Sequence, residues 1–327
     1  MNIRRRIVIA LGATALAAPL SCLAQQPVKM RRIGFLGPSS AAGIASRLEG
    51  LRAGLRERGY IEGENLIIEF RWAESNYERL PALAAELVRN KVEIIVTHTS
   101  AGSRAAKQAT AAIPIVTATV GDPVGTGLVA SLARPGGNLT GLSIVSPEIS
   151  AKRLELIKEA LPRIRRAAVL FNQDNPSTKQ EIDAISVTAG ALKLELQQYG
   201  TRGPNEFEDV FSSMSKRRVE AIVIPDDPVM VANAAVLARI ATKHRIPTIG
   251  FTELADAGGL MMYGVNFPAL FRHAAVFIDK ILKGAKPGEL PIEQPTKFEM
   301  VINIKTAKAL GIKMPNSILV RADRVIE

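Results

Sequence analysis

Residues 32–58, RIGFLGPSSAAGIASRLEGLRAGLRER, contain a short apolar run followed by a longer amphipathic one. The run at 32–36 predicts a strand, and the leucines at 48, 51 and 55 predict a helix over 46–58. The same order of strand and helix continues along the chain. Strands that are apolar throughout and alternate with helices are typical of a parallel sheet that is buried on both faces.

The alternation of strands and helices extends through both halves of the chain. In the first half, strands are predicted at 66–70, 93–96 and from 113 onward, and helices at 78–88, 101–112 and 124–132. In the second half, helices are predicted at 148–161, 177–191, 206–216, 229–244 and 269–282, and strands at 167–171, 194–199, 221–224, 247–251 and 298–302, with an apolar segment at 260–265. The pattern repeats although the sequence does not, which indicates two lobes of similar build.

The expected domain organisation follows from the length of the chain and from this repeated pattern. Residues 25–327 exceed one ordinary hydrophobic core, so two domains are expected. We predict that lobe 1 comprises 25–143 plus 264–300 and lobe 2 comprises 144–263. The joint lies near 138–143, and the return segment 301–327 is left without a lobe. The predicted fold class is α/β, with two Rossmann-like parallel-sheet lobes joined by hinge strands into a clamshell.

The N-terminal segment has the three parts of a secretory signal peptide. Arg4–Arg6 supply a basic start, 7–20 is a short apolar run, and cleavage is expected after Ala24. The run is too short for a comfortable membrane-spanning helix. A twin-arginine route is an alternative, as is a lipoprotein anchored through Cys22. The expected location of the mature protein is the periplasm.

Composition excludes several classes of function. Cys22 is the only cysteine, and cleavage after Ala24 would remove it. The mature chain would then have no disulfide, no thiolate metal ligand and no cysteine nucleophile. The formal net charge of +11 is spread along the chain and aromatic residues are scarce. This pattern favours a solvated basic surface over nucleic-acid binding.

In an open parallel sheet, ligands bind beyond the carboxyl ends of the strands. With two lobes facing each other, the loops at these ends line one cleft. The candidate ligand-binding residues in these loops are Ser39, Ser40, Thr97, Thr99, Ser100 and Asp122 in the first lobe, and Asn172, Asn175, Asp227 and Phe251 in the second.

Each candidate has a binding role and a structural alternative. Thr99 and Ser100 open a helix, whose free amides and partial positive charge could hold a carboxylate, or they cap that helix. Asp122 and Asp227 could bind an ammonium, or act as N-caps before a proline. Asn172 and Asn175 could bind the ligand or fix a turn, and Phe251 could cover an apolar group or belong to the core. Only one of the neighbours Asp226 and Asp227 is expected to face the cleft.

Motifs for catalysis and cofactors are weak or missing in the sequence. Residues 125–130, GTGLVA, fit a dinucleotide-binding pattern, but they do not follow the first strand and no suitable acid comes about 20 residues later. His98, His244 and His273 have no metal-ligand spacing. No nucleophile elbow or phosphate-binding loop is present. We therefore expect no catalytic residue, no cofactor and no metal.

The stretch 134–141, RPGGNLTG, is the most specific of several in which the chain resembles a known family. The others are 33–36, 70–74, 79–84, 121–129, 152–156, 295–299 and 307–311. In these stretches the chain resembles the substrate-binding proteins of bacterial ABC importers that are described as tryptophan/tyrosine transport system substrate-binding proteins. The resemblance covers essentially the whole chain after the signal.

The resemblance implies a fold like that of type I periplasmic binding proteins, which closes on its ligand and docks on a membrane permease. In amino-acid-binding members, hydroxyl and backbone groups of the first lobe hold the carboxylate, and an aspartate of the second lobe holds the amine. Asp227 is the counterpart of that aspartate. Members that bind aromatic amino acids often have Thr-Asp-Asn where this chain has Asp226, Asp227 and Pro228, so the ligand stays open.

The function expected from these observations is capture of an amino acid or related small organic molecule for an ABC permease, by a monomeric protein. One alternative is a ligand-sensing module for a membrane receptor. Another is a two-lobed isomerase or racemase. Cofactor-free racemases of that build use paired cysteines, and the chain after Ala24 has none.

Overall fold

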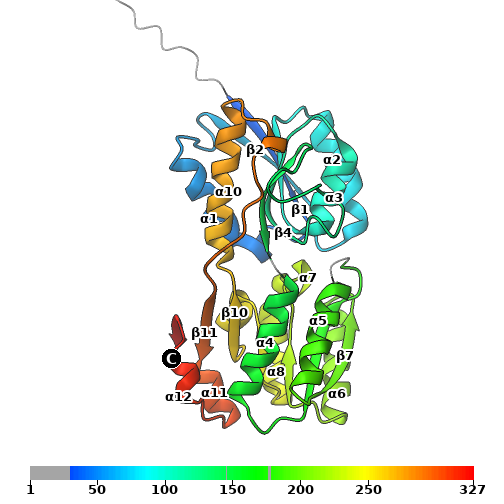
Figure 1. Ribbon diagram of the computed structural model, residues 1–327, viewed down its shortest axis with the longest axis vertical. Helices are drawn as coiled ribbons and strands as arrows, with labels where there is room; N and C mark the ends of the chain where they lie inside the picture. Colours follow the sequence, from blue (N-terminus) through cyan, green and yellow to red (C-terminus); the bar gives the residue numbers. More distant parts are fainter. Residues whose placement is uncertain (1–29, 145, 176–177) are drawn as a thin grey trace, which may run out of the picture.

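The computed structural model describes residues 30–144, 146–175 and 178–327, which form two lobes stacked along the long axis of the molecule (Figure 1). The predicted signal peptide and Cys22 lie outside the described residues. Within the described ranges, every helix is too short or too polar to cross a bilayer.

The first lobe is built on a five-stranded parallel sheet in the order β2-β1-β3-β4-β5. Its strands are β1 (Arg31–Gly37), β2 (Leu66–Trp72), β3 (Ile94–Thr97), β4 (Ile115–Gly121) and β5 (Leu139–Ile144). The helices are α1 (Ala45–Arg56), α2 (Leu80–Arg89), α3 (Thr99–Ala109) and α10 (Phe267–Leu282). α1 packs against α10 on one face of the sheet, and α2 packs against α3 on the other (Figure 1). Coverage of both faces explains why the central strands β3 and β4 are buried along nearly their whole length.

The second lobe is built on a seven-stranded sheet in the order β12-β11-β10-β9-β8-β6-β7, in which only β10 and β11 are antiparallel. The strands are β6 (Arg166–Asn172), β7 (Glu195–Thr201), β8 (Ala221–Val223), β9 (Thr248–Gly250), β10 (Met261–Gly264), β11 (Glu299–Asn303) and β12 (Arg324–Ile326). The helices are α4 (Ser146–Ala160), α5 (Thr178–Ala191), α6 (Phe207–Lys216), α7 (Pro228–Ala232), α8 (Ala234–His244), α9 (Thr252–Asp256), α11 (Ile304–Leu310) and α12 (Asn316–Leu319).

The chain passes from one lobe to the other at three places, and residue 145, at the first of them, lies outside the described residues. The chain crosses after β5, between β10 and α10, and again before β11 (Figure 1). The last connection lies along β5, where Ser143 N donates to Glu293 O at 2.9 Å and Glu293 N donates to Gly141 O at 3.0 Å. Several separate chain connections between two lobes are typical of proteins that close by a hinge motion. The return segment 301–327 joins the sheet of the second lobe through β11 and β12.

The stretch RPGGNLTG has a structural explanation in this fold. Asn138 donates from its side-chain amide to the carbonyl oxygens of Thr110 and Ile113, at 2.9 and 2.8 Å. Gly141 has a φ of +129°, and a Cβ at this position would lie 2.1 Å from Thr117 O. Only glycine tolerates that approach without displacing a neighbouring strand. The motif therefore fixes β5 against β4 and does not contact the cavity described below.

Two sequence predictions about elements were wrong. The segment 124–132 is a turn instead of a helix, because Asp122 accepts a hydrogen bond from Gly125 N at 2.8 Å and Gly127 has a φ of +70°. The expected joint near 138–143 falls on β5, and the chain enters the second lobe directly after this strand. The single helix predicted at 229–244 is two helices, because the backbone of Asn233 leaves helical geometry and its side chain bonds Val229 O at 2.8 Å.

Candidate functional site

A cavity lies between the two lobes and is lined by both of them. About 550 Å³ of space between protein atoms, part of it open to solvent, is bounded by the carboxyl ends of β3 and β4 and by the loop after β8. The lining residues of the first lobe and its hinge are Ile44, Arg47, His98, Thr99, Ser100, Thr119, Val120, Gly121, Ile144 and Phe267. Those of the second lobe are Ser146, Asn175, Glu181, Asp226, Asp227, Pro228 and Val231. The position agrees with the general rule for open parallel sheets.

The first-lobe face is built around the N-terminus of α3. Thr99 begins this helix with a φ of +66°, a conformation that β-branched residues rarely adopt. Its hydroxyl accepts a hydrogen bond from Gly102 N at 3.3 Å, and the Ser100 hydroxyl donates to Gly121 O at 3.1 Å. The start of an eleven-residue helix offers backbone amides and partial positive charge to an anionic group.

His98 lies directly before α3 and is buried, with 2% of its surface exposed. Its ring packs near Phe35 and Phe271, at centroid distances of 6.2 and 5.7 Å. Burial, with a smaller contribution from the charge of Arg47, lowers the pKa of His98 to about 3. Among the described residues Nε2 has no hydrogen-bond partner. His98 therefore presents a neutral imidazole to this side of the cavity.

On the second-lobe face, Asp227 receives hydrogen bonds from four groups. Val229 N donates to Oδ1 at 2.7 Å, which makes Asp227 the N-cap of α7. Asn172 donates to both carboxylate oxygens at 3.2 Å, and Asn175 donates to Oδ2 at 2.9 Å. The hydroxyl of Tyr77, from the first lobe, donates to Oδ2 at 3.0 Å. Burial raises the pKa of Asp227, and these hydrogen bonds act in the opposite direction.

Asp226 has a different environment although it is the adjacent residue. Its Oδ2 pairs with Arg153 Nη2 at 2.7 Å, and the Arg153 side chain is 1% exposed. Arg153 also donates to Tyr263 O at 2.8 Å and to Ile224 O at 3.3 Å, so the guanidinium is fixed by three partners. The other oxygen, Oδ1, is buried and has no partner in the described part of the chain.

Glu181, on α5, adds a third carboxyl group to this face. It is 4% exposed and accepts a hydrogen bond from the Ser150 hydroxyl at 2.8 Å. Burial raises the pKa of Glu181 to about 7, and the negative charges of Asp226 and Asp227 act in the same direction. The second-lobe face therefore holds more acidic groups than the single buried guanidinium of Arg153 can neutralise.

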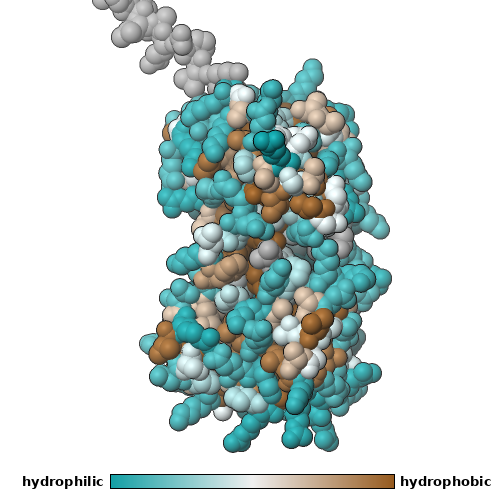
Figure 2. Space-filling view, in the orientation of Figure 1, coloured by the Kyte–Doolittle hydropathy of each residue, from teal (hydrophilic) through white to brown (hydrophobic). Residues whose placement is uncertain are grey.

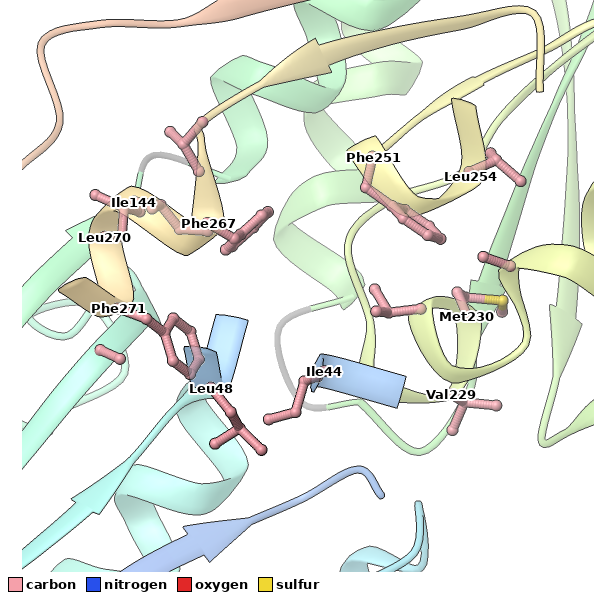
Figure 3. Close-up of a cluster of buried hydrophobic side chains, with 14 of the residues drawn as sticks. Ile44, Leu48, Ile144, Val229, Met230, Phe251, Leu254, Phe267, Leu270 and Phe271 are labelled. Carbon is pink, nitrogen blue, oxygen red and sulfur yellow. The ribbon is translucent and has the colours of Figure 1, made fainter. Parts of the chain in front are cut away.

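Contacts between the lobes surround the cavity. Arg47 on α1 forms a bidentate ion pair with Glu253 on α9, at 2.8 and 3.0 Å, and stacks on the ring of Phe267 at 3.9 Å. The 3₁₀ helix Ala42–Ile44 lies beside α7 of the second lobe, which carries Val229 and Met230 (Figure 3). The surface view shows hydrophobic residues gathered at the narrow region between the lobes (Figure 2). The lobes are thus in contact, with the cavity between them.

The structure brings four of the ten predicted residues to the cavity, namely Thr99, Ser100, Asn175 and Asp227. The other six lie outside its lining: Ser39, Ser40, Thr97, Asp122, Asn172 and Phe251.

Ordinary structural roles account for four of these six. Ser40 and Asp122 accept hydrogen bonds from backbone amides in their own turns, and Thr97 donates to Leu36 O at 2.8 Å. Phe251 is fully buried in the core near Leu254 (Figure 3).

The remaining two act close to the cleft without lining it. Ser39 donates to Pro228 O across the lobes at 3.4 Å, and Asn172 positions Asp227.

The expectation that only one of Asp226 and Asp227 faces the cleft was wrong, because both line it. The alternation of side chains holds along a regular strand, and β8 ends at Val223 before either aspartate. Sequence reasoning also missed Arg47 and Glu181, which lie inside amphipathic helices. A charged residue among the apolar positions of each helix was the one available signal.

The fold and the site together define a two-lobed protein with a cavity between its lobes. A family model for ABC transporter substrate binding proteins matches residues 33–326, and the chain belongs to this family. It is 28% identical over 287 residues to a tyrosine-binding protein of Clostridioides difficile (strain R20291), covering 87% of this chain and 82% of that protein.

Two solved structures are similar over 91% of this chain. A structure from Streptococcus pneumonia, an ABC domain in complex with L-Trp, is 27% identical with a TM-score of 0.84 and is covered completely. A ligand-free, open structure of a substrate-binding protein with adhesive properties from Clostridium difficile is 25% identical with a TM-score of 0.64 and is 99% covered. The TM-score is thus higher against the ligand complex than against the ligand-free, open structure.

Proposed function

We propose that this chain is the periplasmic substrate-binding component of an ABC importer and that it encloses an amino acid between its lobes. The observation that carries the proposal is the polarity of the cavity. Its first-lobe face offers the N-terminus of α3, which suits a carboxylate, and its second-lobe face offers Glu181, Asp226 and Asp227, which suit an ammonium. A zwitterion matches both faces at once.

The rest of the cavity lining supports a ligand with an apolar side chain. Ile44, Val120, Ile144, Val231 and Phe267 form an apolar surface next to the charged groups. The similarity to a tyrosine-binding protein and to a structure in complex with L-Trp makes aromatic amino acids the first ligands to test. Burial of an apolar side chain would contribute about 25 cal/mol per Å² of surface removed from water.

The test is a calorimetric and thermal-unfolding panel of the twenty amino acids on the purified protein. A ligand at 100 times its Kd stabilises the folded state by about 2.7 kcal/mol through mass action, so its binding is visible as a raised Tm. We expect at least one amino acid with an apolar or aromatic side chain to bind. A panel without any binding would refute the proposal.

A pair of variants on one helix checks that binding occurs in this cavity. Ser146 lines the cavity at the start of α4, and Glu148, two residues later, is exposed and outside the lining. Ser146→Trp fills part of the cleft and should abolish binding, whereas Glu148→Trp should leave it intact. Equal binding by both variants would place the ligand elsewhere.

The cellular role is tested separately from binding. The basic start and apolar run of residues 1–24 support export, and the family supports a membrane permease as the partner of a monomeric binding protein. Mass spectrometry of the exported protein should find Gln25 at its N-terminus, and a lipid on Cys22 would indicate a lipoprotein instead. Cells that lack this chain should lose high-affinity uptake of the ligand. Normal uptake with a lost signalling response would favour a receptor module.

The absence of catalysis is part of the same proposal. The ligand should be recovered chemically unchanged, with its chirality intact, after prolonged incubation with the protein. Racemised or isomerised ligand would instead support a two-lobed enzyme.

A further inference from the structure

We infer that the adjacent acids divide two tasks: Asp226 accepts the cationic group of the ligand, and Asp227 joins the lobes through Tyr77. The inference rests on the proposed function, because it assigns the amine-binding residue of that cavity. It also departs from the resemblance to the family, which points to Asp227 for the amine.

The first argument is the hydrogen-bonding capacity of Asp227. An ionised carboxylate has about four acceptor positions. Val229 N, Asn172, Asn175 and the Tyr77 hydroxyl provide four donors, at distances from 2.7 to 3.2 Å. A ligand ammonium could bind Asp227 only by displacing one of these donors.

The second argument is the free oxygen of Asp226. Arg153 occupies Oδ2 at 2.7 Å, while Oδ1 is buried and has no partner among the residues that the structure describes. A buried acceptor without a partner is costly, so such an atom in a cavity lining indicates a place for a ligand donor. Arg153 itself is fixed by two backbone carbonyls, which hold the carboxylate in position.

The third argument is the origin of Tyr77. Tyr77 belongs to the first lobe, in the turn of 3₁₀ helix Tyr77–Arg79 that precedes α2, and its partner Asp227 belongs to the second. Separation of the lobes must break this hydrogen bond. The Asp227 carboxylate therefore stabilises the closed arrangement whether or not a ligand is present, and a change at Asp227 should weaken every ligand by the same factor.

The experiment compares each ligand with its des-amino analogue. The probes are L-tryptophan with indole-3-propionate, L-tyrosine with 3-(4-hydroxyphenyl)propionate, and L-leucine with 4-methylpentanoate, measured by calorimetry and competition. The variants are Asp226→Asn, Asp227→Asn and Tyr77→Phe. Asp174→Asn is the matched control, because Asp174 lies in the same region of the second lobe but is 55% exposed and outside the cavity lining.

The two roles predict different patterns. Asp226→Asn should reduce the preference for the amine-bearing ligand over its analogue by at least about 30-fold, because a desolvated charge pair is lost. Asp227→Asn and Tyr77→Phe should keep that preference and weaken both ligands of a pair equally. General destabilisation lowers both affinities alike, so the preference remains informative for a poorly folded variant.

Small-angle scattering of the ligand-free proteins tests the second role without any ligand. Asp227→Asn and Tyr77→Phe should increase the radius of gyration, and Asp226→Asn and the control should not. Loss of amine preference in Asp227→Asn with retention in Asp226→Asn would overturn the assignment, as would identical scattering by all variants. If none of the probes binds the wild type, the assignment of Asp226 fails together with the proposed function, and scattering still decides the role of Asp227.

Discussion

The two faces of the cleft place buried titratable groups next to the same cavity but shift them in opposite directions. On the first lobe, burial lowers the pKa of His98 to about 3, and on the second lobe burial raises the pKa of Glu181 to about 7. Both shifts favour the neutral form, as desolvation requires. The faces differ in what remains charged. The second lobe keeps a buried aspartate–arginine pair, and the first offers a helix terminus.

This contrast teaches how a symmetric architecture can bind an asymmetric ligand. Both faces are carboxyl ends of parallel strands, so the fold alone does not orient the ligand. In the proposed function, the orientation of the ligand comes from the groups on each face, with acids on the second lobe and backbone amides and hydroxyls on the first. The following predictions alter one face at a time.

Replacement of Arg153 should change the free energy of unfolding more than the other substitutions described below. Arg153→Met leaves Asp226 without its ion-pair partner and removes the hydrogen bonds from Arg153 to two carbonyl oxygens, which should reduce the free energy of unfolding by about 3–5 kcal/mol. Lys152→Met, at the exposed neighbouring position on α4, should change it by less than about 0.5 kcal/mol. Urea unfolding measures both. Similar urea midpoints for the two variants would mean that the buried pair of Arg153 and Asp226 does not stabilise the second lobe.

Neutralisation of Glu181 should change the pH dependence of stability. Because the folded-state pKa of about 7 exceeds the usual 4.5, the wild type loses stability as the pH rises from 4.5 to 7. Glu181→Gln removes that loss, so relative to wild type it should gain about 3 kcal/mol above pH 7 and little below pH 4.5. Urea unfolding at pH 4 and pH 8 tests this, and a pH-independent difference would contradict it.

Replacement of His98 should act in the opposite pH range. Its folded-state pKa of about 3 lies below the usual 6.5, so the wild type loses stability as the pH falls through this window. The free energy of unfolding of His98→Phe, relative to that of the wild type, should therefore be higher at pH 5 than at pH 7.5, by about 2 kcal/mol. Chemical unfolding at the two pH values gives the difference directly. If the stability of His98→Phe relative to wild type instead increased with pH, as expected for Glu181→Gln, the contrast between the faces would be refuted.

Weakening the ion pair between Arg47 and Glu253, which joins the lobes, should have the smallest energetic effect of these substitutions. Glu253→Gln weakens the bidentate contact with Arg47 and should destabilise the closed arrangement by about 1 kcal/mol. All ligands should then bind about fivefold more weakly, without a change in preference among them. Asp256→Asn, which removes an exposed pair with Arg324 within the second lobe, is the control and should leave affinity unchanged. Calorimetry that finds ligand-specific effects would place Glu253 in the binding site itself.

Much of the fold could be predicted from the sequence because its elements carry strong local signals. The apolar runs at 32–36 and 167–171 lie within β1 and β6, and the leucine spacing at 48, 51 and 55 lies within α1. The prediction failed where local chemistry opposed periodicity. The clearest case is the turn at Asp122, where side-chain capping and Gly127 replace the expected helix.

The site could be predicted only in part, because strand ends reveal loops but not the neighbours of each side chain. Thr99, Ser100, Asn175 and Asp227 were found from their places after strands. Glu181 and Arg47 reach the cavity from helices. The fourth hydrogen bond to Asp227 comes from Tyr77, which is 150 residues away in the chain. Only the packing of the two lobes reveals such relations.

The most direct test of the account is a crystal structure with the amino acid that raises the Tm most in the panel. We expect the ligand between the lobes, with its ammonium about 3 Å from Asp226 Oδ1 and its carboxylate at the backbone amides of Thr99 and Ser100. A ligand in the reverse orientation, or one bound outside the cleft, would contradict the account.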